Sequence, residues 1–183
     1  MLSGRAAFAL FTATIPLVTV TGPARADQVS VQAKGKIVGS CSLAATSNFP
    51  TASFAANGSG NATAAINCNQ PFRIRATSAN GAIKSAAVIA PNFTNALPYS
   101  LKADVPLDGG AVVSATCASA SLVTGQSSCA LSPASSGGLS SAAGIATNKT
   151  ATLTLAWTIP VLPTRLIAGS YTDTITLSIA PSP

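Results

Sequence analysis

The side chains that could do acid–base or metal chemistry are few in this sequence of 183 residues. There is no His and no Glu, so the carboxylate side chains are those of Asp27, Asp104, Asp108 and Asp173. Without His, neither a Ser-His-Asp or Cys-His catalytic site nor a His-ligated zinc site can be built. A paired-carboxylate hydrolase would need two of four scattered aspartates. We therefore expect no enzyme, no catalytic residues, no metal and no cofactor.

The overall composition indicates a neutral surface rich in hydroxyl groups. Charged residues are 8% of the chain, against about 25% in an ordinary soluble domain. Ala, Ser and Thr together supply 79 of the 183 residues. Such a surface is typical of an extracellular or structural protein. Basic residues cluster only as the pairs Lys34/Lys36 and Arg73/Arg75, and aromatic residues are few, so we expect no nucleic-acid partner.

The first 26 residues have the pattern of a secretion signal. Residues 1–5 form a short positive segment, and residues 6–20 form an apolar run interrupted by Pro16. Ala24-Arg25-Ala26 then provides a small-x-small cleavage site, which predicts a mature chain that begins at Asp27. A membrane anchor is disfavoured because the apolar run is too short to span a bilayer comfortably.

The predicted export guides the interpretation of the four cysteines, Cys41, Cys68, Cys117 and Cys129. An even number of cysteines in an exported protein predicts two disulfides. Three pairings are possible, and we favour Cys41–Cys68 with Cys117–Cys129 because each pair is nearest in sequence. The CxxC-like spacing of a metal or redox site is absent.

The elements that must position these residues have a period of two, which is typical of strands. The clearest cases are residues 153–159 and 171–179, and weaker cases are residues 64–68, 72–76 and 99–105. Gly- and Asn-rich turns separate them, and we expect residues 132–149 to form a long loop. Short strands at this spacing predict an all-β protein with an antiparallel β-sandwich in one domain.

The first mature segment alternates as well. Val29, Val31, Ala33, Gly35 and Ile37 occupy every second position, with polar residues between them. Either this segment is the first strand of the domain, or it inserts into a neighbouring molecule.

Three groups of residues resemble the motifs of a known protein family. They are Gly35-Lys-Ile-Val-Gly-Ser-Cys41 followed by Ile66-Asn-Cys68, then residues 97–101 (Leu-Pro-Tyr-Ser-Leu), then residues 168–177 (Ala-Gly-Ser-Tyr-Thr-Asp-Thr-Ile-Thr-Leu). Together they resemble the spore coat protein U domain family, which includes the pilin subunits of archaic chaperone–usher pili.

This resemblance implies an immunoglobulin-like sandwich that lacks its final strand. A periplasmic chaperone would first fill the resulting groove, and the N-terminal strand of the next subunit would then replace it at an outer-membrane usher. Strand addition of this kind uses backbone hydrogen bonds for affinity and alternate side chains for specificity. The implied product is a homopolymeric fimbria at the cell surface that supports adhesion and biofilm formation.

The implied organisation is a signal peptide over residues 1–26, a donor strand over residues 27–36 and a pilin domain over residues 37–183. The donor side chains would be those of Val29, Val31 and Ala33, with Ile37 either the last of them or the start of the domain. The acceptor groove would be lined partly by Ile175, Leu177 and Ile179, and Asp173 would have a structural role. The alternative is a secreted coat or matrix protein of the same fold that does not polymerise through an usher.

Overall fold

The computed structural model describes residues 32–134, 137–161 and 164–182. The predicted leader and the predicted donor residues Val29 and Val31 lie outside these ranges. The chain divides into two units, Met1–Lys36 and Ile37–Pro183. In the first unit, residues 32–36 have no regular secondary structure. The strands of the described residues lie in the second unit.

The larger sheet of the second unit has five strands, and each neighbouring pair is antiparallel. In spatial order they are β1 (Cys41–Ser47), β2 (Gly58–Cys68), β10 (Ala146–Trp157), β7 (Tyr99–Pro106) and β8 (Val112–Ala118). Apolar residues alternate with Thr, Ser, Asn and Lys along β2, β7 and β10, so one face is buried and the other meets solvent.

Shorter strands form the opposite layer. One group consists of β13 (Ile175–Pro181), β3 (Phe72–Ser78) and β9 (Leu139–Ser140), with β3 in the centre. A second group is β12 (Tyr171–Thr172), β4 (Ile83–Ser85) and β6 (Ala96–Leu97). A third is the parallel pair β11 (Arg165–Leu166) and β5 (Phe93–Thr94). A 3-10 turn, η1 (Ser119–Leu122), follows β8.

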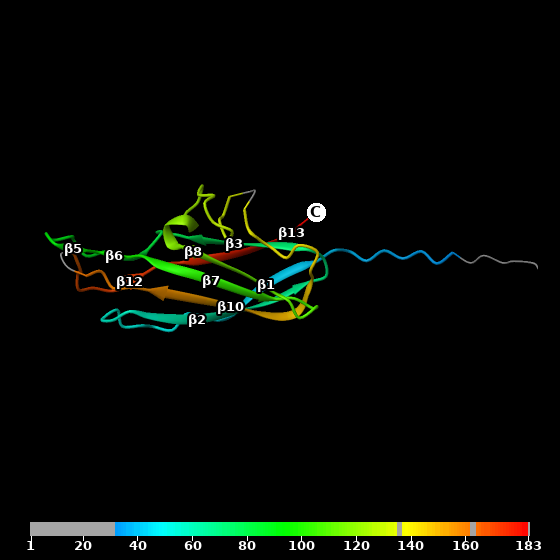
Figure 1. Cartoon of the computed structure of the whole chain (residues 1–183), viewed down its shortest axis with the longest axis horizontal. Helices are drawn as coiled ribbons and strands as arrows, with labels where there is room; N and C mark the ends of the chain where they lie inside the picture. Colours follow the sequence, from blue (N-terminus) through cyan, green and yellow to red (C-terminus); the bar gives the residue numbers. More distant parts are fainter. Residues whose placement is uncertain (1–31, 135–136, 162–163, 183) are drawn as a thin grey trace, which may run out of the picture. The chain divides into compact units, whose positions relative to one another are not determined.

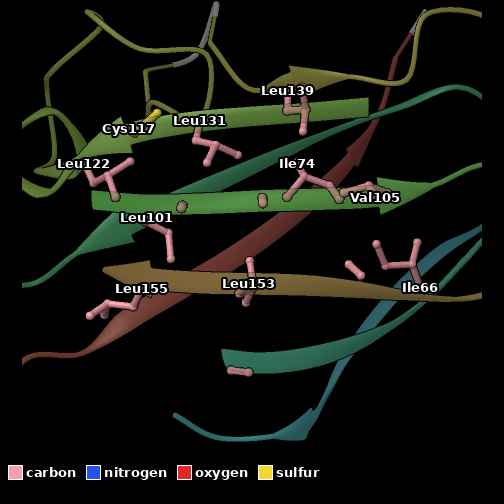
Figure 2. Close-up of a cluster of buried hydrophobic side chains, with 14 of the residues drawn as sticks. Ile66, Ile74, Leu101, Val105, Cys117, Leu122, Leu131, Leu139, Leu153 and Leu155 are labelled. Atoms are coloured by element: carbon pink, nitrogen blue, oxygen red, sulfur yellow. The ribbon is translucent and has the colours of Figure 1, made fainter. Parts of the chain in front are cut away.

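The core lies between the two layers. Figure 2 shows Leu101, Leu153 and Leu155 of the larger sheet and Ile74 of the opposite layer, which belong to one buried cluster. The two layers overlie each other along their length in Figure 1. The protein is therefore an all-β sandwich, as the alternating pattern predicts, and it is immunoglobulin-like, as the family resemblance implies. Its strand pairs are antiparallel apart from β5 and β11.

Two predicted elements need correction. Residues 171–179 were expected to form one strand, but β12 ends at Thr172 and β13 begins at Ile175, because Asp173 bonds to neighbouring backbone and side-chain donors there. Residues 132–149 were expected to form a loop, but β9 lies within them and β10 already begins at Ala146. Small side chains conceal both strands from a hydrophobicity pattern.

Both disulfides join the pairs that lie nearest in sequence. Cys41 and Cys68 face each other across β1 and β2, with their Cα atoms 4.2 Å apart. Cys117 of β8 is bridged to Cys129 in the loop after η1, with a Cα–Cα distance of 5.8 Å. Disulfides persist in oxidising compartments, so this chain is a periplasmic or extracellular protein.

Candidate functional site

Two edge strands, one from each layer, border the candidate site. Strand β13 pairs with β3 on one side, and strand β1 pairs with β2. Within the described residues, no strand pairs with the other edge of either one. Each edge therefore presents backbone N–H and C=O groups that can accept a further strand.

A groove of about 800 Å³ lies between these edges. Leu43 and Ala45 of β1 form one wall, and Ile175 and Leu177 of β13 form the other. Alternate residues of β2 and β10 form the floor: Ala62, Ala64, Leu153, Leu155 and Trp157. We call this feature the β1–β13 groove. These wall and floor residues are apolar, although the lining also includes Ser, Thr and Asn side chains and Asp173. The apolar part suits an extended chain that offers an apolar side chain at every second residue.

The β13 side chains are less buried than their position in the sandwich would suggest. Ile175, Leu177 and Ile179 are only half-buried, whereas Ile74 and Ala76 on the paired strand β3 are fully buried. Half-buried apolar side chains on a core-facing strand leave apolar area in contact with water. A further strand laid along β13 would remove that area from solvent.

The predicted acceptor residues occupy different parts of this region. Ile175 and Leu177 line the groove, but Ile179 does not and instead lies opposite Ile74 in the β3–β13 pair. Of the predicted donor residues, Ala33 is in a segment with no regular secondary structure. Ile37 lies four residues before β1 and is also outside any strand.

Several groove residues had no clear sequence signal. Leu43 and Ala45 sit in a segment of Ala, Ser and Thr whose alternation is too weak to indicate a strand. Phe54 lies between β1 and β2, where no periodic pattern identifies it. Trp157 was expected in a core strand, and its ring does contribute to the core, but it also lines the groove.

Aromatic rings close one end of the groove. Phe54 packs edge-on against Trp157 at 5.2 Å and against Tyr171 at 6.0 Å between ring centroids. Trp157 Nε1 donates to the Ala56 carbonyl at 3.1 Å, and the Tyr171 hydroxyl donates to Ile167 O at 2.7 Å. With these polar atoms bonded to the backbone, the rings present apolar surface to the groove.

Asp173 anchors the start of β13 beside this aromatic end. Its Oδ2 accepts hydrogen bonds from Ser78 Oγ at 2.6 Å and from the Tyr99 hydroxyl at 2.7 Å. Its Oδ1 accepts from the backbone N–H groups of Asn80 and Thr174 at 3.1 and 2.9 Å. A carboxylate that accepts four bonds is a structural group, the role predicted for it.

Burial is the main cause of the raised pKa values of two tyrosines near this carboxylate. It raises the pKa of Tyr99 well above its ordinary value, the hydrogen bond with Ser78 opposes the shift, and the Asp173 carboxylate adds to it. Burial also raises the pKa of Tyr171. Both phenols therefore stay neutral at physiological pH, and the groove end carries no ionised tyrosine.

The other described carboxylates lie outside the groove lining. The hydrogen bond from Ser114 and the pairing with Lys102 at 2.9 Å lower the pKa of Asp104. The backbone N–H of Thr147 lowers the pKa of Asp108, which also pairs with Lys149 at 3.4 Å. Both are surface ion pairs of the ordinary kind.

A scan against protein-family models and a search of curated proteins found no match to this chain. Across the described ranges, no group of three or more His, Cys, Asp or Glu side chains gathers where it could hold a metal ion. Within the same ranges, no helix has the length and apolar character needed to cross a bilayer.

Proposed function

We propose that this protein is a structural subunit of a surface pilus that polymerises by donor-strand exchange. The observation that carries the proposal is the β1–β13 groove, a channel between two edge strands whose walls and floor include Leu43, Ala45, Ile175 and Leu177. A strand laid there would pair with β13 and cover Ile175 and Leu177. The resemblance of residues 168–177 to the spore coat protein U domain family supports the same function.

The complementary strand in this proposal is the segment 27–36 of another copy. Its residues Val29, Val31 and Ala33 would enter the groove while the polar residues between them face solvent. Each copy then has one groove and one donor segment, so the contact is head-to-tail. Such a contact does not close on itself, so it generates an open fibre. An empty groove would invite uncontrolled strand pairing, so the proposal includes a periplasmic chaperone and an outer-membrane usher as partners.

A non-polymerising secreted coat or matrix protein is the second candidate. Only four residues, 37–40, separate the predicted donor strand from β1. A connection of this length is common in hairpins, so the segment could fold back along β1 of its own chain. The groove would then be filled without a second molecule.

The test compares two substitutions on the donor segment of the exported chain, expressed with a chaperone and usher. Val31→Asp places a charge in the apolar groove, so we expect it to abolish the fibres seen by electron microscopy. Gln32→Asp adds the same charge on the opposite side of the strand and should preserve them. Fibres from the Val31→Asp protein, or from a chain that lacks residues 27–36, would contradict the proposal.

A further inference from the structure

One end of the second unit exposes large apolar side chains. Val88 is 88% exposed and Val161 is 83% exposed, and Ile89 and Phe93 are also exposed. Val88 and Ile89 lie between β4 and β5, Phe93 begins β5, and Val161 lies between β10 and β11. Strands β5, β6 and β12 gather at this end in Figure 1. We call these four residues the apolar tip.

The loops of the apolar tip are held by hydrogen bonds. Asn95 Nδ2 donates to the carbonyls of Ser85 and Ala87, which secures the segment just before Val88. The backbone N–H of Arg165 donates to Asn92 O at 3.0 Å, which joins the second loop to the first. The segment that carries Val88, Ile89 and Phe93 is thus held in place at both ends, so a partner that covers it need not order it first.

A second exposed apolar pair lies at the other end of the same unit. Ile37 is 90% exposed and Val38 is 72% exposed. Asn69, in the turn between β2 and β3, donates from Nδ2 to Val38 O at 3.0 Å and accepts from Ser40 N at 2.8 Å. We call Ile37 and Val38 the apolar base. It sits beside the end of β13, because Ser182 N bonds to Pro71 O in that same β2–β3 turn.

The direction of the donor strand decides which ends meet. Strand β13 runs from the tip end toward the base end, since Ile175 lies opposite Ser78 and Pro181 lies opposite Phe72. A donor strand parallel to β13 would bring the base of its own domain to the base of the acceptor. Each copy would then have to use its one base for both the copy before it and the copy after it, so the fibre could not grow. An antiparallel donor strand brings base to tip, which repeats without limit.

The length of the donor segment brings these two surfaces close together. Ten residues span about 33 Å in a strand, and the seven residues of β13 span about 23 Å. If the donor segment covers β13, about three residues remain, or about 10 Å. That remainder reaches the region of β12, which pairs with β4 immediately before the tip loop. No free linker is left between the groove and the next domain.

We propose that the apolar base of one copy packs on the apolar tip of the next copy in the fibre. This inference rests on the proposed function, because the donor strand supplies the tether. Both surfaces are apolar and solvent-exposed in the single chain, and the contact would remove both from water. It would make the fibre a stack of docked domains, with the donor strand as one of two contacts between copies.

Crosslinking of assembled fibres tests the contact directly. The mature chain carries Val38→Cys in the base with Ile89→Cys in the tip, and fibres are treated with a short bis-maleimide. The native cysteines are all bridged and do not react. The matched control is Val38→Cys with Val112→Cys, because Val112 is 56% exposed, close to the 59% of Ile89, but belongs to β8. After boiling, we expect a ladder of covalent multimers for the tip pair and none for the control.

Other results overturn the contact and separate it from the proposed function. Fibres that form but give no ladder, or equal ladders for both pairs, would remove the contact and leave donor-strand exchange in place. Crosslinked dimers from Val38→Cys alone would indicate base-to-base packing, which also contradicts it. If the unsubstituted chain forms no fibres with its chaperone and usher, the proposed function fails and the contact fails with it.

A second measurement does not depend on cysteines. Val88→Asp with Ile89→Asp places two charges in the tip and leaves the groove lining unchanged. We expect these fibres to break up at a lower temperature than fibres with the single control Val112→Asp. Equal dissociation temperatures for the two sets of fibres would contradict the contact.

Discussion

At the scale of single residues, Asp173 determines where the edge strand of the groove begins. Its hydrogen bonds tie the start of β13 to Ser78 and Asn80 at the end of the paired strand β3 and to Tyr99 of the opposite layer. Ser78 and Tyr99 are buried, and both hydroxyls donate to this carboxylate. The sequence shows an aspartate that interrupts an apolar face, but it cannot show which donors the fold brings to it.

Removal of this carboxylate should destabilise the domain. Asp173→Ala leaves two buried hydroxyls without their acceptor, and we expect a loss of about 2 kcal/mol in the free energy of unfolding. Urea unfolding measures it. The control is Asp104→Ala, which removes an exposed ion pair and should cost less than ~1 kcal/mol. Equal losses for the two variants would show that the Asp173 hydrogen bonds stabilise the domain no more than an exposed ion pair does.

The buried phenol beside Asp173 predicts a loss of stability in alkali. The unfolded chain ionises Tyr99 near pH 10, whereas burial raises the pKa of Tyr99 above that value in the folded protein. Its contribution is therefore fully present below about pH 10 and falls as the pH rises further. Tyr99→Phe should show a smaller fall between pH 9 and pH 11.5 in urea unfolding. If the free energy of unfolding falls equally in both proteins, groups other than Tyr99 cause the loss of stability.

At the scale of elements, the predictable strands are those with large side chains in alternation. Residues 153–159 and 99–105 were expected as strands, and β10 and β7 contain most of them. Strand β1 was not expected at these bounds, because Ala, Ser and Thr dominate it and its position depends on pairing with β2. The groove was therefore only half predictable. The alternation of β13 puts Ile175 and Leu177 on one face and the family resemblance implies their place in a groove, but the facing wall depends on tertiary structure.

The two disulfides should differ in their effect on the groove. Each closes a loop that stabilises the fold by about 3 kcal/mol in the chain-entropy model. Replacing Cys41 and Cys68 by Ala also removes the covalent link between β2 and β1, which forms one wall of the groove. We expect this variant to lose both stability and affinity for a synthetic peptide of residues 27–36, as measured by fluorescence polarisation.

The matched control for the groove disulfide replaces Cys117 and Cys129, which lie outside the groove lining. That variant should lose a similar free energy of unfolding but keep its peptide affinity. Comparable loss of affinity in both variants would show that stability alone, not the position of β1, controls binding.

At the scale of the whole molecule, the central claim is that the second unit is one strand short and that residues 27–36 supply the missing strand. Strand β13 ends at Pro181, close to the chain terminus. A segment attached behind Pro183 by a flexible linker can therefore turn back and run antiparallel to β13. Such a fusion presents the donor strand to the groove within one chain and removes the need for a second copy.

Thermal unfolding of residues 37–183, with and without residues 27–36 fused behind Pro183, is the most direct measurement. A control fusion carries Val29→Asp and Val31→Asp. We expect the native fusion to raise the Tm by on the order of 10 °C, because 1 kcal/mol shifts the Tm by ~3 °C in a domain of this size. The control fusion should melt like the unfused domain. A stable, monomeric unfused domain whose Tm neither fusion changes would mean a complete sandwich and would contradict the account.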